Sequence, residues 1–496
     1  MAPLRYIRVV KLELITAEGP ATLWMRKGRL IRFPQLTMPL LAALTPDGVE
    51  IHHTDEIVSP VNFCRGADLV GITTTTCSAP HAYELADEFR ARGVTVVLGG
   101  PHPTLLPQEA AQHADSVLIG EAEGVWPVLI QDFQTGRLKR LYRAAAPPSL
   151  AGLPWARREL IERRAYGRGV LIATRSCPHA CGYCMLPHYY HHQYRCRPSA
   201  EVVAEAASIR EKALIFWDDN IIGNPGYARG LFRGLIPLRK SWTSQATFNI
   251  VDHDDLIQLA AASGCEALFI GLESISAASL RETGKAFNQP QRYLDGIKKL
   301  HDAGIAVRTG LVFGFDHDDV TVFERTLAFL EKAGVDVASV GSLTPFPGTP
   351  IFRSLEAEGR ILTRDWSKYN ARTDVVFQPR QMTPEQLQGG VEWVTRQFFS
   401  LRSISWRLLG GSRTGLWWNI PRNLGYKIAF DKLGRCGYNP ARAPGQVSGR
   451  SDEPPENATW SAAGDSLSFT PPHAPPMAHA PKLISETSQP VRPKVR

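Results

Sequence analysis

The stretch that decides the fold is GVLIATRSCPHACGYCMLPHYYHHQYRCRP, residues 169–198. A short apolar run is followed at once by three cysteines, Cys177, Cys181 and Cys184, with the spacing CxxxCxxC. Three thiols crowded into one turn-rich loop, out of eight in 496 residues, are not distributed like the bridges of a secreted disulfide framework. The loop therefore predicts a metal centre in a reducing compartment, with a fourth ligand that the spacing does not supply.

Three interpretations of this loop are open. A structural zinc site needs four protein ligands, and Cys196, His179 or His188 could supply the fourth. An iron–sulfur cluster held by three thiolates leaves one iron free for a small ligand. Inert buried cysteines are the third interpretation, and a loop that contains Pro178 and Gly182 is a poor place for them. Because zinc knuckles usually pair two CxxC-like hooks, the spacing and the position after a strand favour the cluster.

Outward from the loop, apolar runs alternate with amphipathic stretches, which is typical of βα units and a parallel sheet. Strands are expected at residues 169–174, 213–217, 245–250, 267–271, 307–315 and 337–343, with helices at 199–211, 254–264, 293–304 and 320–334. Six parallel strands with right-handed crossovers predict a partial (β/α)6 barrel of the TIM type, whose active site lies at the carboxyl ends of the strands. The cysteine loop follows the first strand, so we expect it at that catalytic mouth.

A second α/β pattern precedes the barrel. Strands are expected at residues 68–74, 95–100 and 116–120, with helices at 81–93 and 106–114. They predict a doubly wound domain of Rossmann-like or flavodoxin-like type. The turns at Gly99-Gly100-Pro101 and Gly120-Glu121 follow strands directly, at the edge where open α/β sheets bind ligands.

Composition divides the chain into five parts: a first α/β domain (1–145), a linker (146–164), the barrel (165–365), a helical C-terminal module (366–440) and a tail (441–496). The linker is rich in Pro and Gly. In the helical module, residues 383–409 predict one amphipathic helix with a dense aromatic and aliphatic face. The Pro-rich tail cannot bury enough apolar surface to offset the entropy of ordering it, so we expect disorder there.

Charge and hydropathy exclude several functional classes. The net charge is +8, but the chain lacks the interleaved aromatic and basic pattern of an RNA-binding sheet, so no nucleic-acid partner is expected. The first residues do not form a signal peptide, and no later stretch offers roughly 20 uninterrupted apolar residues. We expect a soluble cytoplasmic protein with more than one packed core.

The motif CPHACGYC after the first barrel strand resembles the signature of the radical S-adenosylmethionine (radical SAM) superfamily. Four later motifs resemble further landmarks of that family, in order: FWDDNIIGNP (216–225), LFIGLESIS (268–276), GLVFGFDHD (310–318) and LTPFPGTP (343–350). The resemblance covers roughly residues 165–365. It implies that Cys177, Cys181 and Cys184 hold a four-iron four-sulfur (4Fe-4S) cluster, with S-adenosylmethionine as the missing ligand of the fourth iron. It further implies that reductive cleavage of this cofactor gives a 5'-deoxyadenosyl radical, with an electron from an external donor of the flavodoxin or ferredoxin type.

By the same resemblance, several residues at the strand ends are expected to contact the cofactor: Tyr183, Asp218, Asp219, Glu273, Ser274, Gly310 and Gly314. Glu273, assisted by Ser274, is suited to accept hydrogen bonds from a ribose or an ammonium group, or alternatively to cap the next helix. Asp218 and Asp219 either reach a cofactor or substrate or simply favour a turn. Gly310 and Gly314 allow close approach to adenine, or tight helix–strand packing. No catalytic side chain is predicted beyond these contacts. The segment HYYHHQY is interpreted as a polar, aromatic loop near the substrate.

Residues 96–127 resemble the cobalamin-binding domain that precedes the barrel in one large radical SAM subgroup. The implied cobalamin contacts are Thr73, Thr74, Gly99, Gly100, His102, Thr104, Gly120 and Glu121. Many cobalamin domains carry a DxHxxG loop whose histidine binds cobalt from below, and residues 1–150 contain no such loop. His81 and His102 lie near the expected ligand edge without that context. We therefore expect a displaced dimethylbenzimidazole with no histidine in its place; a degenerate domain that no longer binds corrinoid is the alternative.

Together these resemblances imply a cobalamin-dependent radical SAM methyltransferase that methylates an unactivated carbon of a small molecule or lipid. One alternative is an oxidative cyclase like that of bacteriochlorophyll synthesis, with the same cofactors. A second alternative is a zinc-stabilised, non-enzymatic binding protein. The aromatic and basic residues of 395–409 and 415–430 could face a lipid substrate or a membrane surface, which would make the protein membrane-peripheral, or could form the core of their own module.

Overall fold

The computed structural model describes residues 9–20, 22, 32, 34–409 and 416–431. The chain divides into two units, Met1–Ala443 and Pro444–Arg496, and all described residues belong to the first. The predicted disordered tail and residues 432–440 of the predicted helical module lie outside the described residues. Within the described part, no helix is long and apolar enough to cross a membrane.

The first sheet has six parallel strands in the order β2-β1-β3-β4-β5-β6. The strands are β1 (Val10–Thr16), β2 (Val49–Asp55), β3 (Leu69–Thr73), β4 (Thr95–Gly99), β5 (Ser116–Ile119) and β6 (Leu141–Arg143). The helices are α1 (Thr37–Leu44), α2 (Ala79–Ala91), α3 (Pro101–Leu105), α4 (Pro107–His113) and α5 (Trp126–Gln134). The order of the first five strands is flavodoxin-like.

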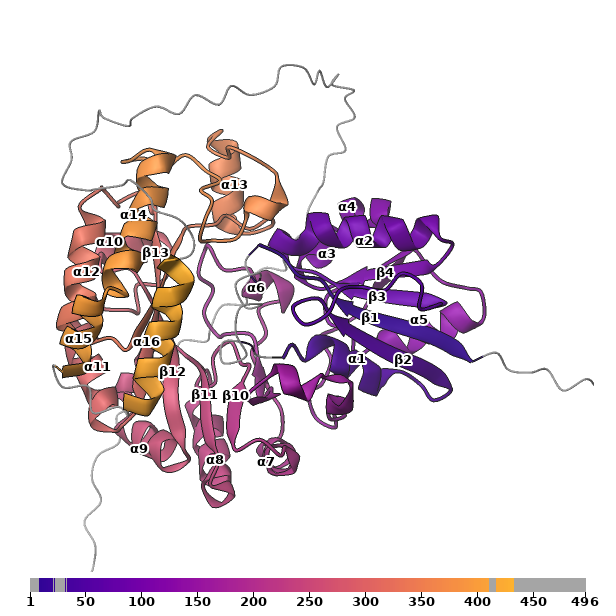
Figure 1. Ribbon diagram of the computed structural model, residues 1–496, viewed down its shortest axis with the longest axis horizontal. Helices are drawn as coiled ribbons and strands as arrows, with labels where there is room; N and C mark the ends of the chain where they lie inside the picture. The colour runs from indigo at the N-terminus through magenta and orange to yellow at the C-terminus, as the bar shows by residue number, and fades with distance from the viewer. Residues whose placement is uncertain (1–8, 21, 23–31, 33, 410–415, 432–496) are drawn as a thin grey trace, which may run out of the picture. The chain divides into compact units, whose positions relative to one another are not determined.

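Separate apolar cores cover the two faces of this sheet. One contains residues of α2 and α4, and the other contains residues of α1 and α5 (Figure 1). Helices on both faces make the domain doubly wound, as the sequence predicts. The carboxyl ends of β3, β4 and β5 lie together at one edge, which brings the Thr73, Gly99 and Gly120 turns into one place.

The second sheet has six parallel strands in the order β14-β13-β12-β11-β10-β7. Its strands are β7 (Gly169–Leu171), β10 (Ala213–Phe216), β11 (Ser241–Ala246), β12 (Cys265–Glu273), β13 (Ala306–Phe313) and β14 (Val337–Ser342). The helices between and after them are α7 (Ser199–Ser208), α8 (Pro225–Leu235), α9 (Asp254–Ala262), α10 (Ala277–Glu282), α11 (Tyr293–Asp302), α12 (Val322–Lys332) and α13 (Pro350–Ala357). Strands consecutive along the chain are neighbours, and β7 and β14 form the two edges, which gives the predicted partial barrel.

Some elements differ from the sequence prediction. The third barrel strand ends at Ala246, and the apolar residues after it form a 3-10 helix, Phe248–Asp252, in place of the predicted strand 245–250. A short apolar run does not by itself distinguish a strand from a buried helical turn. The sequence prediction did not include the strands β1, β2 and β6 or the helices α1, α3, α5, α8, α10 and α13.

The helical module packs against the last strand of the barrel. It comprises α14 (Pro384–Phe398), α15 (Leu401–Leu409) and α16 (Leu416–Asp431), and α14 contacts both α12 and β14 (Figure 1). A capping box between Thr383 and Gln386 starts α14. A Cβ on Gly390 would lie 2.2 Å from the Phe323 ring, so glycine permits this close packing. The single helix predicted over 383–409 is interrupted after Phe398.

Candidate active site

The cysteine loop begins near the carboxyl end of β7 and is anchored to later elements of the barrel. β8 (Thr174–Arg175) pairs antiparallel with β9 (Arg195–Cys196) and closes the loop at its base. The Gly182 amide donates to the Thr283 carbonyl at 2.9 Å, and the Ile351 amide donates to the Gly182 carbonyl at 3.1 Å. The anchored loop carries three free thiols: Cys177, Cys181 and Cys184.

This donor set fits an iron–sulfur cluster. Burial raises the pKa of all three thiols, and raises the pKa of Cys184 to about 12, so the thiolates need a positive charge beside them. Lys285 provides one such charge near Cys177 and Cys181. Among the described residues, no three His, Cys, Asp or Glu side chains could hold a single ion together. A cluster does not require that arrangement, because each thiolate binds a different iron.

Glu273, at the end of β12, has a backbone conformation that is uncommon for a residue with a side chain. Its φ is +65°, and the register of the sheet shifts between Gly271 and Glu273; such bulges re-aim side chains and are frequent at functional sites. The Lys285 ammonium donates to Glu273 Oε1 at 2.7 Å. A Cβ on Gly271 would lie 2.2 Å from that oxygen. Glycine at position 271 therefore leaves room for the pair.

Tyr183 and Lys285 join Glu273 to the cysteine loop. Burial raises the pKa of Tyr183, and the charges of Glu273 and Cys181 raise it further. Sequence reasoning singled out Tyr183 and Glu273 but missed Lys285. A lysine twelve residues after a strand end, in the run TGKAF, carries no sequence signal that distinguishes it from a surface lysine.

Asp218, Asp219 and Asn220 hold the start of the cysteine loop in place. Asp218 is fully buried and accepts hydrogen bonds from the Thr174 amide and hydroxyl. Asp219 accepts from the Ser176 amide at 2.9 Å, and the Asn220 amide nitrogen donates to Cys177 Sγ at 3.5 Å. Three consecutive residues after β10 thus bind the segment that leads into the first cysteine.

The electrostatics of the two aspartates follow from their burial. Burial raises the pKa of Asp218 to about 7 and that of Asp219 to about 6. Asp219 lines a cavity of about 420 Å³ that residues of both α/β domains form, whereas Asp218 is not among the lining residues. Of the two predicted contacts, Asp219 is therefore the one placed to reach a ligand there.

Ser274, Gly310 and Gly314 make contacts within the protein. The Ser274 hydroxyl accepts from the Ser276 amide at 3.0 Å. A Cβ on Gly310 would lie 2.8 Å from the Phe269 ring, and one on Gly314, whose φ is +100°, would lie 2.7 Å from Leu387. The Gly314 contact, with a residue of α14, corresponds to the helix–strand packing alternative, whereas Phe269 beside Gly310 belongs to the neighbouring strand β12. Contact of Ser274, Gly310 and Gly314 with a cofactor stays a prediction.

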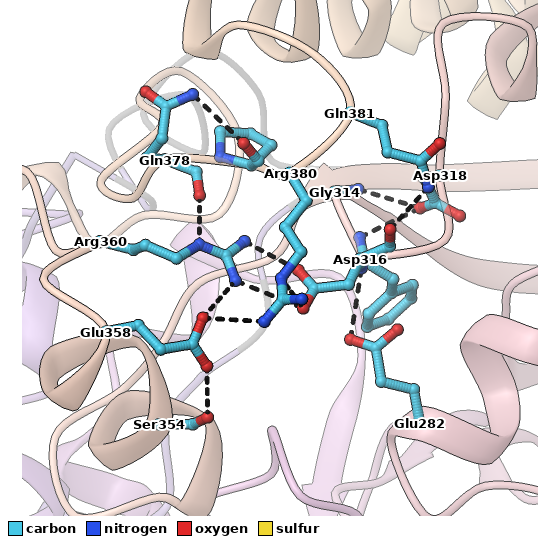
Figure 2. A network of polar contacts seen from close by, with 12 residues as sticks. Glu282, Gly314, Asp316, Asp318, Ser354, Glu358, Arg360, Gln378, Arg380 and Gln381 are labelled. Carbon is cyan, nitrogen blue, oxygen red and sulfur yellow. Dashed lines mark hydrogen bonds and ion pairs between the residues drawn. The ribbon is translucent and has the colours of Figure 1, made fainter.

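Charged residues after α13 secure the loop that follows β13 (Figure 2). Arg360 and Arg380 both pair with the Asp316 carboxylate at 2.7 Å, and Glu358 pairs with both arginines. Asp318 accepts from the Gly314 amide at 3.0 Å. This network fixes the loop at the carboxyl end of a central barrel strand.

A cavity of about 420 Å³ is lined by residues of both α/β domains. From the first domain come six of the predicted cobalamin contacts: Thr73, Thr74, Gly99, Gly100, Gly120 and Glu121. From the barrel come Arg175, Tyr189, Tyr190, Trp217 and Asp219. The structure thus brings the cobalamin-side turns and the start of the cysteine loop to one cavity.

The glycine turns of this cavity fit a bulky flat ligand. Gly100 has φ +100°, and a Cβ there would lie 2.8 Å from Thr73 Oγ1 and from the Thr74 carbonyl oxygen. Gly120 has φ +80° with no atom within 4 Å of its Cβ position. The Thr104 hydroxyl donates to the Gly100 carbonyl at 2.7 Å and accepts from the Gly120 amide at 2.9 Å. Thr104 therefore ties the two turns together without lining the cavity.

Neither histidine near the expected ligand edge lines the cavity. His102 is fully buried, and its Nε2 is 3.1 Å from Glu109 Oε1. Hydrogen bonding to Glu56 raises the pKa of His81. His102, an expected cobalamin contact, does not line the cavity. Its contact with cobalamin stays a prediction, as does the absence of a histidine that binds cobalt from below.

Buried ion pairs join the two domains beside the cavity. Arg175 pairs with Glu121 at 2.5 Å and with Glu123, and Arg195 pairs with Glu121 at 2.5 Å. The Tyr189 hydroxyl donates to the Gly120 carbonyl at 3.4 Å. Glu121, expected to contact a cofactor, is thus engaged with two arginines that sequence reasoning missed.

Comparisons with known proteins identify both domains. Residues 171–330 match the Radical SAM superfamily and residues 36–130 match the B12 binding domain. The chain is 31% identical to bacteriochlorophyllide d C-12(1)-methyltransferase of Chlorobaculum tepidum, over 77% of this chain and 86% of the relative. It is 24% identical to the anaerobic magnesium-protoporphyrin IX monomethyl ester cyclase of Cereibacter sphaeroides, over 79% and 72%.

A solved structure shares the fold. The cobalamin-dependent S-adenosylmethionine radical enzyme OxsB, with aqua-cobalamin and S-adenosylmethionine bound, superposes with a TM-score of 0.63 at 13% identity, over 86% of this chain and 72% of OxsB. The predicted fold class is confirmed, and the family matches favour the cluster over zinc in the cysteine loop. The chain therefore belongs to the cobalamin-dependent radical SAM C-methyltransferase family, and it is an enzyme whose cofactors are a 4Fe-4S cluster, S-adenosylmethionine and cobalamin.

Proposed function

We propose that the enzyme transfers a methyl group to an unactivated aliphatic carbon on the periphery of a tetrapyrrole of the chlorophyllide type. The observation that carries this proposal is the 31% identity, over 86% of its length, to a methyltransferase named for the C-12(1) position of bacteriochlorophyllide d. An aliphatic carbon of this kind has no acidic proton, so acid–base catalysis has no starting point there.

The aromatic residues on the barrel side of the cavity support the proposal that the substrate is a flat aromatic macrocycle. Tyr189, Tyr190 and Trp217 line it there, and the rings of Tyr189 and Tyr190 are 4.7 Å apart, nearly perpendicular to each other. Aromatic side chains offer apolar faces on which a macrocycle can stack.

The residues at the two domains have distinct proposed roles. Cys177, Cys181 and Cys184 hold the cluster, Glu273 with its partner Lys285 binds the polar part of S-adenosylmethionine, and the Gly100 and Gly120 turns receive the corrin. When bound, the cluster and S-adenosylmethionine supply a 5'-deoxyadenosyl radical, and cobalamin supplies the methyl group. The ion pairs of Arg175 with Glu121 and Glu123 hold the two sites together.

The partners follow from this chemistry. An external one-electron donor of the flavodoxin or ferredoxin type reduces the cluster, because reductive cleavage of S-adenosylmethionine consumes an electron that must be supplied to the cluster. The enzyme acts in the cytoplasm, with peripheral membrane contact through its C-terminal helices. The domain boundaries near residues 145, 165 and 365 are part of the same proposal, supported by the ends of β6 and the start of β7.

Anaerobic reconstitution tests the reaction. The full chain is loaded with iron, sulfide and cobalamin and incubated with S-adenosylmethionine, a reductant and bacteriochlorophyllide d. The expected products are the singly methylated pigment, 5'-deoxyadenosine and S-adenosylhomocysteine together. The Cys181→Ala variant is the control and should give none of them. Deoxyadenosine with an oxidised or ring-closed pigment, and no S-adenosylhomocysteine, would favour the cyclase reaction instead.

A further inference from the structure

Helix α16 has its polar side against the protein and its apolar side outward. Asn419, Asn423 and Tyr426 contact the rest of the chain, whereas Ile420, Leu424 and Ile428 are exposed. The exposed three are spaced by four residues, so they form a single stripe along the helix. A helix on the surface of a water-soluble domain normally shows the opposite arrangement.

A buried hydrogen-bond network fixes α16 in this orientation. Asn419 Nδ2 donates to Asp336 Oδ1 at 2.6 Å, and Asn423 Nδ2 donates to the Asp336 carbonyl at 3.1 Å. Arg407 donates to Asn423 Oδ1 at 3.1 Å and to the Val335 carbonyl at 2.8 Å. Rotating the helix to bury its apolar stripe would leave these buried groups without partners, which costs more than burying the stripe would gain.

The preceding helix extends the exposed apolar surface. In α15, Leu401 is 59% exposed and Trp406 is 69% exposed, and α15 contacts α16. Five of the twelve large apolar side chains that are strongly exposed in the described part of the chain lie within residues 401–428. We call these five the α15–α16 face: Leu401, Trp406, Ile420, Leu424 and Ile428. Three of the five, Ile420, Leu424 and Ile428, form one stripe, and a stripe differs from the single apolar residues scattered on ordinary surfaces.

The charge of the same segment selects the kind of partner. Residues 401–430 contain no acidic residue. Of their basic residues, Arg402 is exposed and Lys427 is half-buried, whereas Arg407 is buried in the network described for α16. A second copy of this face would bring like charges together, whereas an anionic lipid surface complements both the apolar side chains and the basic residues.

We propose that the α15–α16 face docks the enzyme on the surface of an anionic lipid bilayer. The face inserts its apolar side chains at the level of the head groups without crossing the bilayer, and Trp406 is suited to that depth because indole is amphipathic. This inference rests on the proposed peripheral membrane contact and deepens it by naming the surface and the lipid charge, and it does not depend on which substrate the barrel takes.

Flotation of the full-length, cluster-loaded enzyme with vesicles tests the proposal. Vesicles are made of phosphatidylcholine alone or of phosphatidylcholine with phosphatidylglycerol. We expect binding to the mixed vesicles, weakened by added salt, and a loss of affinity of about tenfold or more in the double variant Leu424→Ser, Ile428→Ser. Arg402→Glu should weaken binding to the mixed vesicles.

The matched control is Leu362→Ser, which removes an exposed leucine from a different segment and should bind like the wild type. Iron content and deoxyadenosine formation check that each variant is folded. Equal binding by the wild type and the double variant would overturn the proposal, as would binding to phosphatidylcholine vesicles as tight as to mixed ones. A dimer that the double variant converts to monomer, measured by light scattering, would identify a second copy as the partner instead.

Discussion

Arg175 Nη1 lies 2.5 Å from Glu121 Oε1, and both side chains are buried. Arg175 stands two residues before Cys177 in the barrel, and Glu121 directly follows the Gly120 turn of the cobalamin-binding domain. A single ion pair therefore connects the loop that carries the cluster ligands to the turn expected to receive the corrin. Glu123 and Arg195 extend it to a network of four charges.

Replacing Arg175 with methionine leaves Glu121 and Glu123 with less positive charge at a buried position. Breaking a buried pair in this way costs about 3 kcal/mol or more, so we expect the melting temperature of the holoenzyme to fall by roughly 3–6 °C. Differential scanning calorimetry under anaerobic conditions provides the measurement. The control variant Arg402→Met, which replaces an exposed arginine, should have the same melting temperature as the wild type. Equal melting of both variants would show that the network does not hold the domains together.

Gly100 permits the close approach of two strand ends. Its φ is +100°, and an added Cβ would lie 2.8 Å from both Thr73 Oγ1 and the Thr74 carbonyl, so Gly100→Ala should displace the cavity edge. We expect the cobalt content after loading with cobalamin to fall at least about fivefold, with four irons per chain retained. Elemental analysis measures both metals at once.

The Gly136→Ala variant is the control that separates the effect of backbone strain from the effect of a changed cavity edge in Gly100→Ala. Gly136 lies in the same domain and also has a positive φ, +70°, but its Cβ would meet no atom within 4 Å. The Gly136→Ala variant should therefore bind cobalamin normally. If both alanine variants lost cobalt alike, general destabilisation and not the cavity edge would be the cause.

The barrel was predictable because its strands are short apolar runs in a regular βα rhythm, and because the cysteine spacing marks the first of them. The outer strands of the first sheet lack that signal. β2 reads VEIHHTD, with polar residues at most positions, and β1 carries a buried charge, Glu13, whose Oε1 accepts from Thr54 of β2. A strand at the edge of a sheet tolerates polar residues that a periodicity argument counts against it.

The sequence predicted the site only where the functional residues lie close together in one short segment. The three cysteines and the Gly99-Gly100 and Gly120-Glu121 turns can be recognised from local sequence. The pairs Glu273–Lys285 and Arg175–Glu121 are separated by 12 and 54 residues. No local pattern links such partners, because the fold alone brings them together.

Asp318 should make stability depend on pH. Burial raises its pKa to about 6 from the ordinary value of 3.8. Because the folded-state pKa is higher than the unfolded one, the stabilising contribution is complete below about pH 4 and is lost as pH rises through about 6. Asp318→Asn keeps an acceptor for the Gly314 amide and cannot ionise.

We therefore expect the difference in melting temperature, wild type minus Asp318→Asn, to decrease between pH 4 and pH 8. The shift of about two pKa units corresponds to roughly 3 kcal/mol at most. Asp319→Asn is the control, because that carboxyl is exposed and its pKa is lowered by hydrogen bonding to Thr321. A difference that is constant with pH would show that Asp318 stays ionised across the range.

The Glu273–Lys285 pair should govern the affinity for S-adenosylmethionine, and Glu273→Gln should leave cluster assembly intact because Lys285 keeps its charge beside the cysteines. The Glu273 carboxylate accepts a hydrogen bond from the Lys285 ammonium at 2.7 Å. The left-handed backbone conformation of Glu273 directs this side chain toward the cysteine loop. A charge-assisted hydrogen bond to a ligand contributes about 1.5–3 kcal/mol. Glu273→Gln should therefore raise the dissociation constant of S-adenosylmethionine roughly 10- to 100-fold, at an unchanged iron content.

The Lys285→Met variant shows whether Glu273 contacts S-adenosylmethionine directly or only holds Lys285 in position. If Glu273 binds the cofactor itself and Lys285 orients it, the lysine variant should also weaken binding, but less than Glu273→Gln does. Titration of the reduced cluster with S-adenosylmethionine, followed by electron paramagnetic resonance, reads the bound fraction at the iron directly. Glu282→Gln is the matched control, since Glu282 lies near Lys285 in sequence and accepts from the Asp316 amide instead. Normal titrations in both Glu273→Gln and Lys285→Met would remove this pair from the cofactor site, and the strained conformation of Glu273 would then serve the packing of β12 alone.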